Sequence, residues 1–410
     1  MTEKVKITLQ TLDFADIKPA KKAVSIKPVP KITIEPTPTP PDEVMASYSG
    51  KVFNALAKVN TKDAQEVKNK LVMRQAEAIF IISKTINNIP VVLGINAHKL
   101  LKYGLDAFIK QNPNLRKEGN TFIQYEVAIP FEPFCRDIGY KIDPDPNAPN
   151  PAAEKKRTQE RLRDARRNIR QLLDRLHDLS STWTEKTRHG KTLARANEAE
   201  TDDLDFTNYS FVGTHSIKDG LIKMTLDPTF INDYIVALAL PQTKYNRRLA
   251  GIKDSIAYIL GDMLYQHYVF PNNVIKGTND ILKVETILKG LPLPTYEELE
   301  GVIDPKTGKR VGGKDPRRWR DRIKERLEEA LDLLYADGTL GFWSYTKAKK
   351  QPYTDQEAQE DLYYYERWKE SYVHFAFTGN HTVSLIEEYK KEAEGRASKR
   401  KKATVNTKST

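Results

Sequence analysis

Arginine and lysine gather in two segments of this chain, at spacings suited to contacting phosphate groups. Between Pro151 and Arg175 the sequence has nine cations against four acids, and between Lys314 and Arg326 it has seven against three. Like charges three or four residues apart on a helix repel each other unless an anion lies nearby. The planar fork of N–H donors on arginine matches phosphate oxygens and the edge of guanine. The two segments are therefore candidates for an interface with nucleic acid.

An apolar stripe accompanies each cluster and predicts a long helix. The first helix is expected over residues 152 to 179, with apolar residues from Leu162 to Leu176 on one face and arginines opposite them. The second is expected over residues 316 to 335, where Trp319 to Leu334 form the inner stripe and the cations precede an acidic half. The alternative interpretation of both is a solvated basic face that acids in the same helix neutralise.

Polar segments after the two helices, residues 185 to 205 and 346 to 370, carry further cations. They could reach phosphates or the minor groove, although flexible polar loops have the same composition. The predicted DNA-binding residues are Lys156, Arg163, Arg166, Arg167, Arg170, Arg188, Lys191, Lys314, Arg317, Arg318, Arg320, Lys324 and Lys347.

The expected elements around the basic helices follow one order twice. In the first copy, a helix after Asn96 precedes a strand at 123 to 129, a short helix at 131 to 138, the first long helix and a hairpin around Asp219-Gly220. In the second, a helix at 245 to 268 precedes a short helix at 284 to 288, the second long helix, and strands at 340 to 345 and 372 to 377. This is the order of the winged helix, a helix-turn-helix variant whose third helix enters the major groove.

The predicted fold class is therefore α+β and mainly helical, with two tandem winged-helix domains. Residues 1 to 45 contain many prolines and are expected to be a disordered arm. Leading helices with an apolar stripe from Val52 to Ile86 and the first winged-helix domain would occupy residues 46 to 240. The second domain would occupy residues 241 to 385, and residues 386 to 410 would form a basic tail.

Composition excludes several classes of protein. The 410 residues include 66 Lys and Arg against 55 Asp and Glu, for a net charge of +11. No segment approaches the roughly 20 consecutive apolar residues of a membrane-spanning helix, and residues 1 to 13 lack the apolar core of a secretory signal. The single cysteine, Cys135, excludes an internal disulfide framework and a cysteine-based zinc site. These features predict a cytoplasmic protein with no membrane partner.

Motifs for catalysis are incomplete. Gly190-Lys191-Thr192 lacks the earlier glycine of a phosphate-binding loop, and Gly313-Lys314 is followed by Asp315 in place of Ser or Thr. Tyr363-Tyr364-Tyr365 could supply a nucleophile for DNA nicking, but no His-x-His pair accompanies it. The acidic pairs Asp203-Leu204-Asp205 and Asp143-Pro144-Asp145 are weak candidates for Mg²⁺. We expect no enzyme activity, no metal and no cofactor.

Several blocks resemble the replication initiator proteins of bacterial plasmids and related mobile elements. They are Ala97 to Phe108, Ile129 to Gly139, Tyr209 to Tyr234 with its Ile217-Lys218-Asp219-Gly220 turn, Tyr245 to Tyr268, Arg318 to Leu334 and Leu340-Gly341-Phe342-Trp343. The resemblance covers about residues 90 to 380 and is one of pattern and order. The long proline-rich arm and the connections at 140 to 151 and 291 to 315 depart from it.

The resemblance implies tandem winged-helix domains that bind double-stranded DNA at repeated origin sites and start replication without catalysis. It also implies a host helicase or polymerase as further partners and an equilibrium between monomer and dimer. Two alternatives stay open from the residues alone. One is a transcriptional or partition regulator that binds DNA, and the other is a nicking or primase enzyme whose site is unrecognised.

Overall fold

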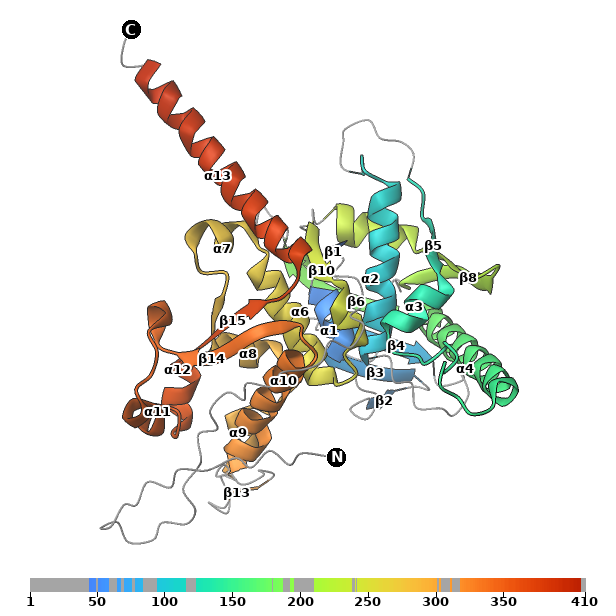
Figure 1. The fold of residues 1–410 in the computed structure, drawn as a ribbon, viewed down its shortest axis with the longest axis horizontal. Coiled ribbons are helices and arrows are strands. Elements are labelled where there is room, and N and C mark those ends of the chain that lie inside the picture. The colour runs from blue at the N-terminus through green and yellow to red at the C-terminus, as the bar shows by residue number, and fades with distance from the viewer. Residues whose placement is uncertain are drawn as a thin grey trace. The chain divides into compact units, whose positions relative to one another are not determined.

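A computed structural model describes most of the chain beyond its N-terminal segment (Figure 1). The described residues are 44–48, 51–58, 65–67, 70–75, 78–83, 94–115, 123–178, 180–186, 192–194, 210–237, 240, 242–300, 302–303, 310–311 and 318–406. All belong to one compact unit, Pro38–Thr410. The fold is mixed α+β and mainly helical, with small antiparallel sheets, which confirms the predicted α+β class. Apart from Val44 and Met45, the predicted disordered arm lies outside the described residues.

The first group of elements, here called the first module, spans residues 94–226. Its elements are α2 (Gly94–Gln111), β5 (Glu126–Pro130), α3 (Phe131–Asp137), α4 (Pro151–Asp178), β8 (Val212–Lys218) and β9 (Leu221–Leu226). The strands form an antiparallel sheet in the order β5-β9-β8. Helix α4 packs against β8 and α2, and α2 packs against β5. The sheet therefore supports the long basic helix.

Alternation along β9 and a two-residue turn set the register of this sheet. Ile222, Met224 and Leu226 are buried, and the residues between them are half-buried. Asp219 and Gly220, at the turn to β9, both have positive φ, 53° and 71°. Two consecutive residues with positive φ form the hairpin turn that matches the twist of antiparallel strands. The predicted hairpin is confirmed.

The second module, residues 255–377, repeats this order and this pairing. Its elements are α6 (Ser255–Tyr268), β11 (Ile281–Lys283), α8 (Val284–Gly290), the π-helical turn η5 (Arg320–Lys324), α10 (Glu325–Ala336), β14 (Leu340–Thr346) and β15 (Tyr372–Phe377). Its sheet has the order β11-β15-β14, so the first strand again pairs with the third. In Figure 1 the first module runs from cyan to yellow-green and the second from yellow to red.

Other elements precede or follow the modules, join them, or lie in the connections within them. The N-terminal ones are β1 (Val44–Tyr48), α1 (Lys51–Lys58), β2 (Gln65–Val67), β3 (Lys70–Gln75) and β4 (Ala78–Ser83), and β6 (Ser180–Lys186) and β7 (Thr192–Ala194) complete a sheet of order β2-β3-β4-β6-β7. The rest are α5 (Pro228–Phe230), η2 (Ile231–Val236), β10 (Gln242–Asn246), η3 (Arg247–Gly251), α7 (Pro271–Lys276), α9 (Tyr296–Glu300), β12 (Val302–Ile303), β13 (Arg310–Val311), η6 (Ala348–Lys350), α11 (Asp355–Asp361), α12 (Tyr365–Glu370) and α13 (Asn380–Asn406).

The N-terminal segment corrects two expectations. The apolar stripe from Val72 to Ile86 predicted a helix, but its described part lies in β3 and β4, which pair with each other, with Val72 opposite Ile81. Val and Ile are β-branched and favour strands, and the apolar run at 79 to 82 fits a strand as well as a helix. Val44 and Met45, which were assigned to the disordered arm, lie in β1 and pair with Asn246 and Tyr245.

Three further boundaries differ from the sequence prediction. The helix expected from residue 245 begins at Ser255, because the Asp254 side chain accepts from the Ala257 N–H and caps it there. Residues 346 to 370, expected as a polar wing, contain α11 and α12. The predicted basic tail falls largely within α13.

Buried polar side chains join α2 to the segment that begins the second module. The Lys99 ammonium donates to the carbonyl of Ile252 at 2.7 Å, and the Lys102 ammonium lies 3.6 Å from the Asp262 carboxylate. Burial, together with the positive charge of Lys253, lowers the pKa of Lys99 to about 7. An unpaired buried cation is costly, so partial loss of its proton is the expected response.

Candidate nucleic-acid interface

Helix α4 begins at a proline and is capped by the residue before it. The Asn150 side chain accepts from the Ala153 N–H at 3.1 Å, which satisfies one of the free donors of the first turn. Ala165, Ile169, Leu173 and Leu176 are at most 1% exposed. This stripe fixes the rotation of the helix about its axis. Its opposite face must therefore point to solvent.

The solvent face of α4 carries four of the predicted residues, Lys156, Arg163, Arg167 and Arg170. Arg167 lies 3.0 Å from Asp164 in an exposed ion pair. Within the described part of the chain, the other three have no ion-pair partner. Exposed cations without anions raise the electrostatic potential of this face, and a polyanion relieves the repulsion.

Other cations of α4 are used inside the fold. Arg161 lies 2.9 Å and Arg157 4.0 Å from the buried carboxylate of Glu154, which also accepts from the Asp145 N–H. The predicted residue Arg166 stacks over the ring of Phe131 in α3, 5.5 Å from its centroid. Such contacts hold the start of α4 to its neighbours, so Arg166 has a packing contact as well as an exposed position.

A concavity of about 320 Å³ lies between α4 and β8. Its lining residues are Arg170, Asp174, His215, Ser216, Ile217 and Lys218. Lys218 was not among the predicted residues. Its position directly before the predicted Asp219-Gly220 turn is a sequence signal that could have identified it as a cation of the hairpin. The first module thus combines cations from its long helix and its hairpin around one hollow.

The second module places its predicted cations against protein groups. The Arg320 guanidinium lies 3.4 Å from the ring centroid of Tyr363 and donates to the Tyr363 carbonyl at 2.9 Å. The Lys324 ammonium donates to the Leu362 carbonyl at 2.9 Å and lies 3.8 Å from Glu328. Burial lowers the pKa of Lys324. Both side chains hold the segment between α11 and α12 against η5.

The remaining predicted residues divide between paired and undescribed ones. Arg318 lies 3.4 Å from Asp321, with both side chains about half exposed. Lys347 forms an ion pair with Glu357 of α11. Arg188, Lys191, Lys314 and Arg317 lie outside the described residues. The predicted cations without an ion-pair partner among the described residues thus lie on α4, and those of the second module that the structure describes have local partners.

The connection between β14 and β15, residues 347–371, is packed onto the second module by aromatic rings. Trp368 of α12 is fully buried, with its ring centroid 5.3 Å from that of Trp319 and 6.1 Å from that of Tyr365. Of the tyrosine run, Tyr363 and Tyr364 are exposed by 47% and 58%, whereas Tyr365 is stacked on Tyr296. Helix α12 also contacts α8.

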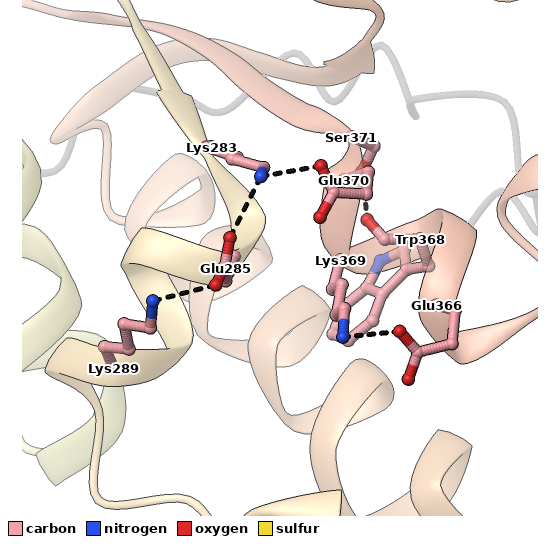
Figure 2. Close-up of polar contacts among 8 residues, drawn as sticks. All are labelled: Lys283, Glu285, Lys289, Glu366, Trp368, Lys369, Glu370 and Ser371. Atoms are coloured by element: carbon pink, nitrogen blue, oxygen red, sulfur yellow. Dashed lines mark hydrogen bonds and ion pairs between the residues drawn. The ribbon is translucent and has the colours of Figure 1, made fainter.

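A chain of ion pairs reinforces this packing (Figure 2). Glu285 of α8 accepts from Lys289 at 2.8 Å and from Lys283 at 2.9 Å, and Lys283 reaches Glu370 of α12 at 2.6 Å. The hydrogen bonds that Lys289 and Lys283 donate to Glu285 lower the pKa of Glu285 to about 2. The hydrogen bonds that Lys283 donates to Glu370 and Glu285 raise the pKa of Lys283. The ion pair between Lys283 and Glu370 thereby ties the connection to β11, and Glu285 links the same lysine to α8.

Groups that could serve catalysis are dispersed. Among the described residues, no three His, Cys, Asp or Glu side chains lie close enough to hold a metal ion together. Asp143 is paired with Arg136 at 2.9 Å, and Asp203 and Asp205 lie outside the described residues. Cys135 is buried, which raises the pKa of its thiol to about 12. Within the same residues, no helix has the length and apolar character needed to cross a bilayer.

Comparison with protein-family models, with curated proteins and with solved structures finds no match to this chain.

Proposed function

We propose that the protein binds double-stranded DNA through α4, with the β8–β9 hairpin against the adjacent backbone. The observation that carries the proposal is the solvent face of α4, where Lys156, Arg163 and Arg170 are exposed and no described acid pairs with them. The phosphate backbone supplies anions at close spacing along the whole length of such a helix. A long helix supported by a small sheet, with a hairpin beside it, also matches the winged-helix variant of the helix-turn-helix.

Two modules with the same order of elements support a tandem winged-helix architecture. The leading role in DNA contact falls to the first module, because Arg320 and Lys324 of the second module already bind protein groups. Arg318 remains exposed enough to add a phosphate contact from the second module. In this proposal, base contacts come from α4 and the second module adds affinity that does not depend on sequence.

The proposed biological role is initiation of plasmid or mobile-element replication at an origin, without catalysis. It rests on the resemblance of the blocks from Ala97 to Trp343 to replication initiators, which spans both modules. The DNA partner would be a set of origin repeats, and a host helicase or polymerase would join the complex. A monomer in equilibrium with a dimer and a location in the cytoplasm belong to the same proposal.

A footprint of the protein on the DNA that flanks its own coding region tests this role. We expect protection of several direct repeats beside an AT-rich stretch. Protection of a single operator over the promoter would favour a transcriptional regulator, and nicking of a supercoiled plasmid with Mg²⁺ would show an enzyme. Absence of any DNA binding at low salt would refute the proposal.

Substitutions in α4 test the interface itself. Arg163→Ala and Arg167→Ala should each weaken binding to the protected repeat by about 1–3 kcal/mol if they contact bases, or lower the salt slope by about one if they contact phosphate. Arg326→Ala is the matched control, because Arg326 is also an exposed arginine on a helix and is paired with Glu329 at 2.9 Å on α10. Circular dichroism would confirm that each variant folds. Equal affinities and salt slopes in all variants would remove α4 from the interface.

A further inference from the structure

We propose that the turn after β14 places the Lys349 ammonium against one backbone phosphate of the bound duplex, and that this turn keeps a strained backbone for the contact. The site deepens the DNA-binding function proposed above and depends on it. The turn covers residues 347–351 and includes η6. The Lys349 side chain is exposed, and no residue that the structure describes pairs with it.

The turn is closed tightly at its base. Thr346 and Pro352 form an antiparallel bridge, and the Lys347 N–H donates to the Gln351 carbonyl at 2.8 Å. The chain therefore reverses its direction within residues 347–351. A reversal this short requires residues with positive φ, for which glycine and asparagine are the usual choices.

Two consecutive lysines occupy these positions. Lys349 and Lys350 both have a φ of 61°, and the ψ of Lys349 is 28°. A residue with a Cβ atom is disfavoured in this left-handed region, so each lysine lowers stability relative to glycine. Strain of this kind persists where the surrounding structure enforces it, and it is concentrated at functional sites. The residue type at such a position then has a reason other than the local backbone preference.

The three lysines of the turn have different surroundings. Lys347 forms an ion pair with Glu357 of α11, and the Lys350 ammonium lies 2.7 Å from the carboxylate of Asp280, just before β11. These two pairs hold the turn to its neighbours. No described contact of the Lys349 side chain offsets the strain of its backbone. An ammonium that is held in place and faces solvent is suited to bind a phosphate as a point charge.

The turn has the same place in the second module as the hairpin turn has in the first. In the first module, β8 contacts α4 and leads into Asp219-Gly220, where both residues have positive φ. In the second, β14 contacts α10 and leads into the turn that contains Lys349. A module that places its long helix on DNA brings the adjacent hairpin to the backbone. The Lys349 contact would therefore supply the sequence-independent affinity proposed for the second module.

Two substitutions separate the charge of Lys349 from its strain. Lys349→Ala removes the ammonium and keeps a Cβ atom, whereas Lys349→Gly removes both. Anisotropy of a short fluorescent duplex with the full chain should give a salt slope lower by about one in both variants. Their affinity at 0.1 M salt should fall by about eightfold, the factor that a slope of about 0.9 gives between 0.1 and 1 M. Lys349→Gly should also have a thermal midpoint about 1–3 °C above that of Lys349→Ala, which a misfolded protein would not show.

Two further variants are controls. Lys349→Arg keeps the charge and should bind as the wild type does. Lys350→Gly is the matched control, because Lys350 has the same φ but its ammonium is held by Asp280, and it should keep the wild-type salt slope. An equal loss of slope in Lys350→Gly would overturn the contact of Lys349, because the charge of the whole turn would then be responsible.

The remaining outcomes distinguish the site from the function. If Arg163→Ala weakens binding while Lys349→Ala and Lys349→Gly keep the wild-type affinity and salt slope, the phosphate site is overturned and the DNA-binding function stands. Equal thermal midpoints of Lys349→Ala and Lys349→Gly would refute the strain. If the wild type binds no duplex, the site and the function are both overturned.

Discussion

The two modules share an order of elements and a strand pairing, but the surroundings of their basic helices differ. In the first, β8 and β9 join through Asp219 and Gly220, and this two-residue turn leaves the solvent face of α4 uncovered. In the second, residues 347–371 separate β14 from β15 and fold back onto η5. The length of one connection thus decides whether a cluster of arginines faces solvent or binds its own chain.

The comparison also shows why a charge run in a sequence has two meanings. Arg170 and Arg320 both stand among other cations on a long helix. Arg170 lines an open hollow, whereas Arg320 stacks on Tyr363 and donates to a main-chain carbonyl. Aromatic faces and carbonyl oxygens compete with phosphate for the same guanidinium. Only the first arrangement leaves the donors for a partner.

Removing the aromatic anchor of the second module should have the largest effect. Trp368→Ala deletes a fully buried indole, and such changes cost about 3–5 kcal/mol of unfolding free energy. Urea denaturation monitored by circular dichroism would measure the loss. Tyr364→Ala, at an exposed ring in the same connection, is the control and should stay within about 0.5 kcal/mol. Equal stability of both variants would mean that the connection is peripheral to the second module, contrary to the comparison.

The buried lysine between α2 and the second module should make stability depend on pH. The pKa of Lys99 falls from 10.5 to about 7 on folding, so the unfolded chain binds more protons between these values. The free energy of unfolding should therefore rise with pH from about 7 to 9.5, by at most about 1.4 kcal/mol per pH unit. This gain from Lys99 is lost again as the pH falls toward 7.

Lys99→Met should flatten this slope, as urea titrations at several pH values would show. Three of the four tryptophans, Trp319, Trp343 and Trp368, lie in the second module, so fluorescence of a Trp183→Phe background reports on that module and circular dichroism on the whole chain. Coincident transitions would show that the two modules unfold together. A slope that persists in the variant would assign the pH dependence to other groups.

Arg320→Ala should separate stability from DNA binding. The variant loses a cation stacked on Tyr363 and a hydrogen bond to its carbonyl, for an expected cost of about 1 kcal/mol of unfolding free energy. Its affinity for duplex DNA should match that of the wild type. Arg318→Ala, at a half-exposed neighbour, is the control for stability. A loss of DNA affinity in Arg320→Ala as large as in Arg163→Ala would remove the difference between the modules.

The smallest effect is expected for the ion-pair chain around Glu285. The pKa of Glu285, about 2, lies below the ordinary 4.5. The stabilising contribution of this carboxylate is therefore present above pH 4.5 and is lost as the pH falls through 2. Glu285→Gln should lower the thermal midpoint slightly at low salt, and the difference should vanish in high salt, because salt screens exposed pairs. A salt-independent difference would point to a packing defect instead.

Local signals predicted much of the fold. The apolar stripe and Pro151 marked α4, which spans Pro151–Asp178 against an expected 152 to 179. Asp-Gly marked the β8–β9 turn, and alternation marked β15 at Tyr372–Phe377. Where the period was ambiguous, as over residues 72–83, the helix prediction was wrong: β4 pairs with the adjacent β3 and with β6, about 100 residues away in the sequence. Asp254 supplied a cap signal that would have placed the start of α6 correctly.

The candidate interface also combines features that the sequence determines with features that only tertiary packing determines. Residue type and helical spacing are properties of the sequence. They determined that α4 carries a basic face opposite an apolar one, and that a run of cations begins the second long helix. What each cation touches depends on chain segments far away, since Arg320 meets Tyr363 and Arg170 shares a hollow with Lys218. Helical periodicity acts over a few residues, whereas the contacts of a charged group depend on packing between distant elements. The tertiary structure alone therefore decided which basic face is open to a partner.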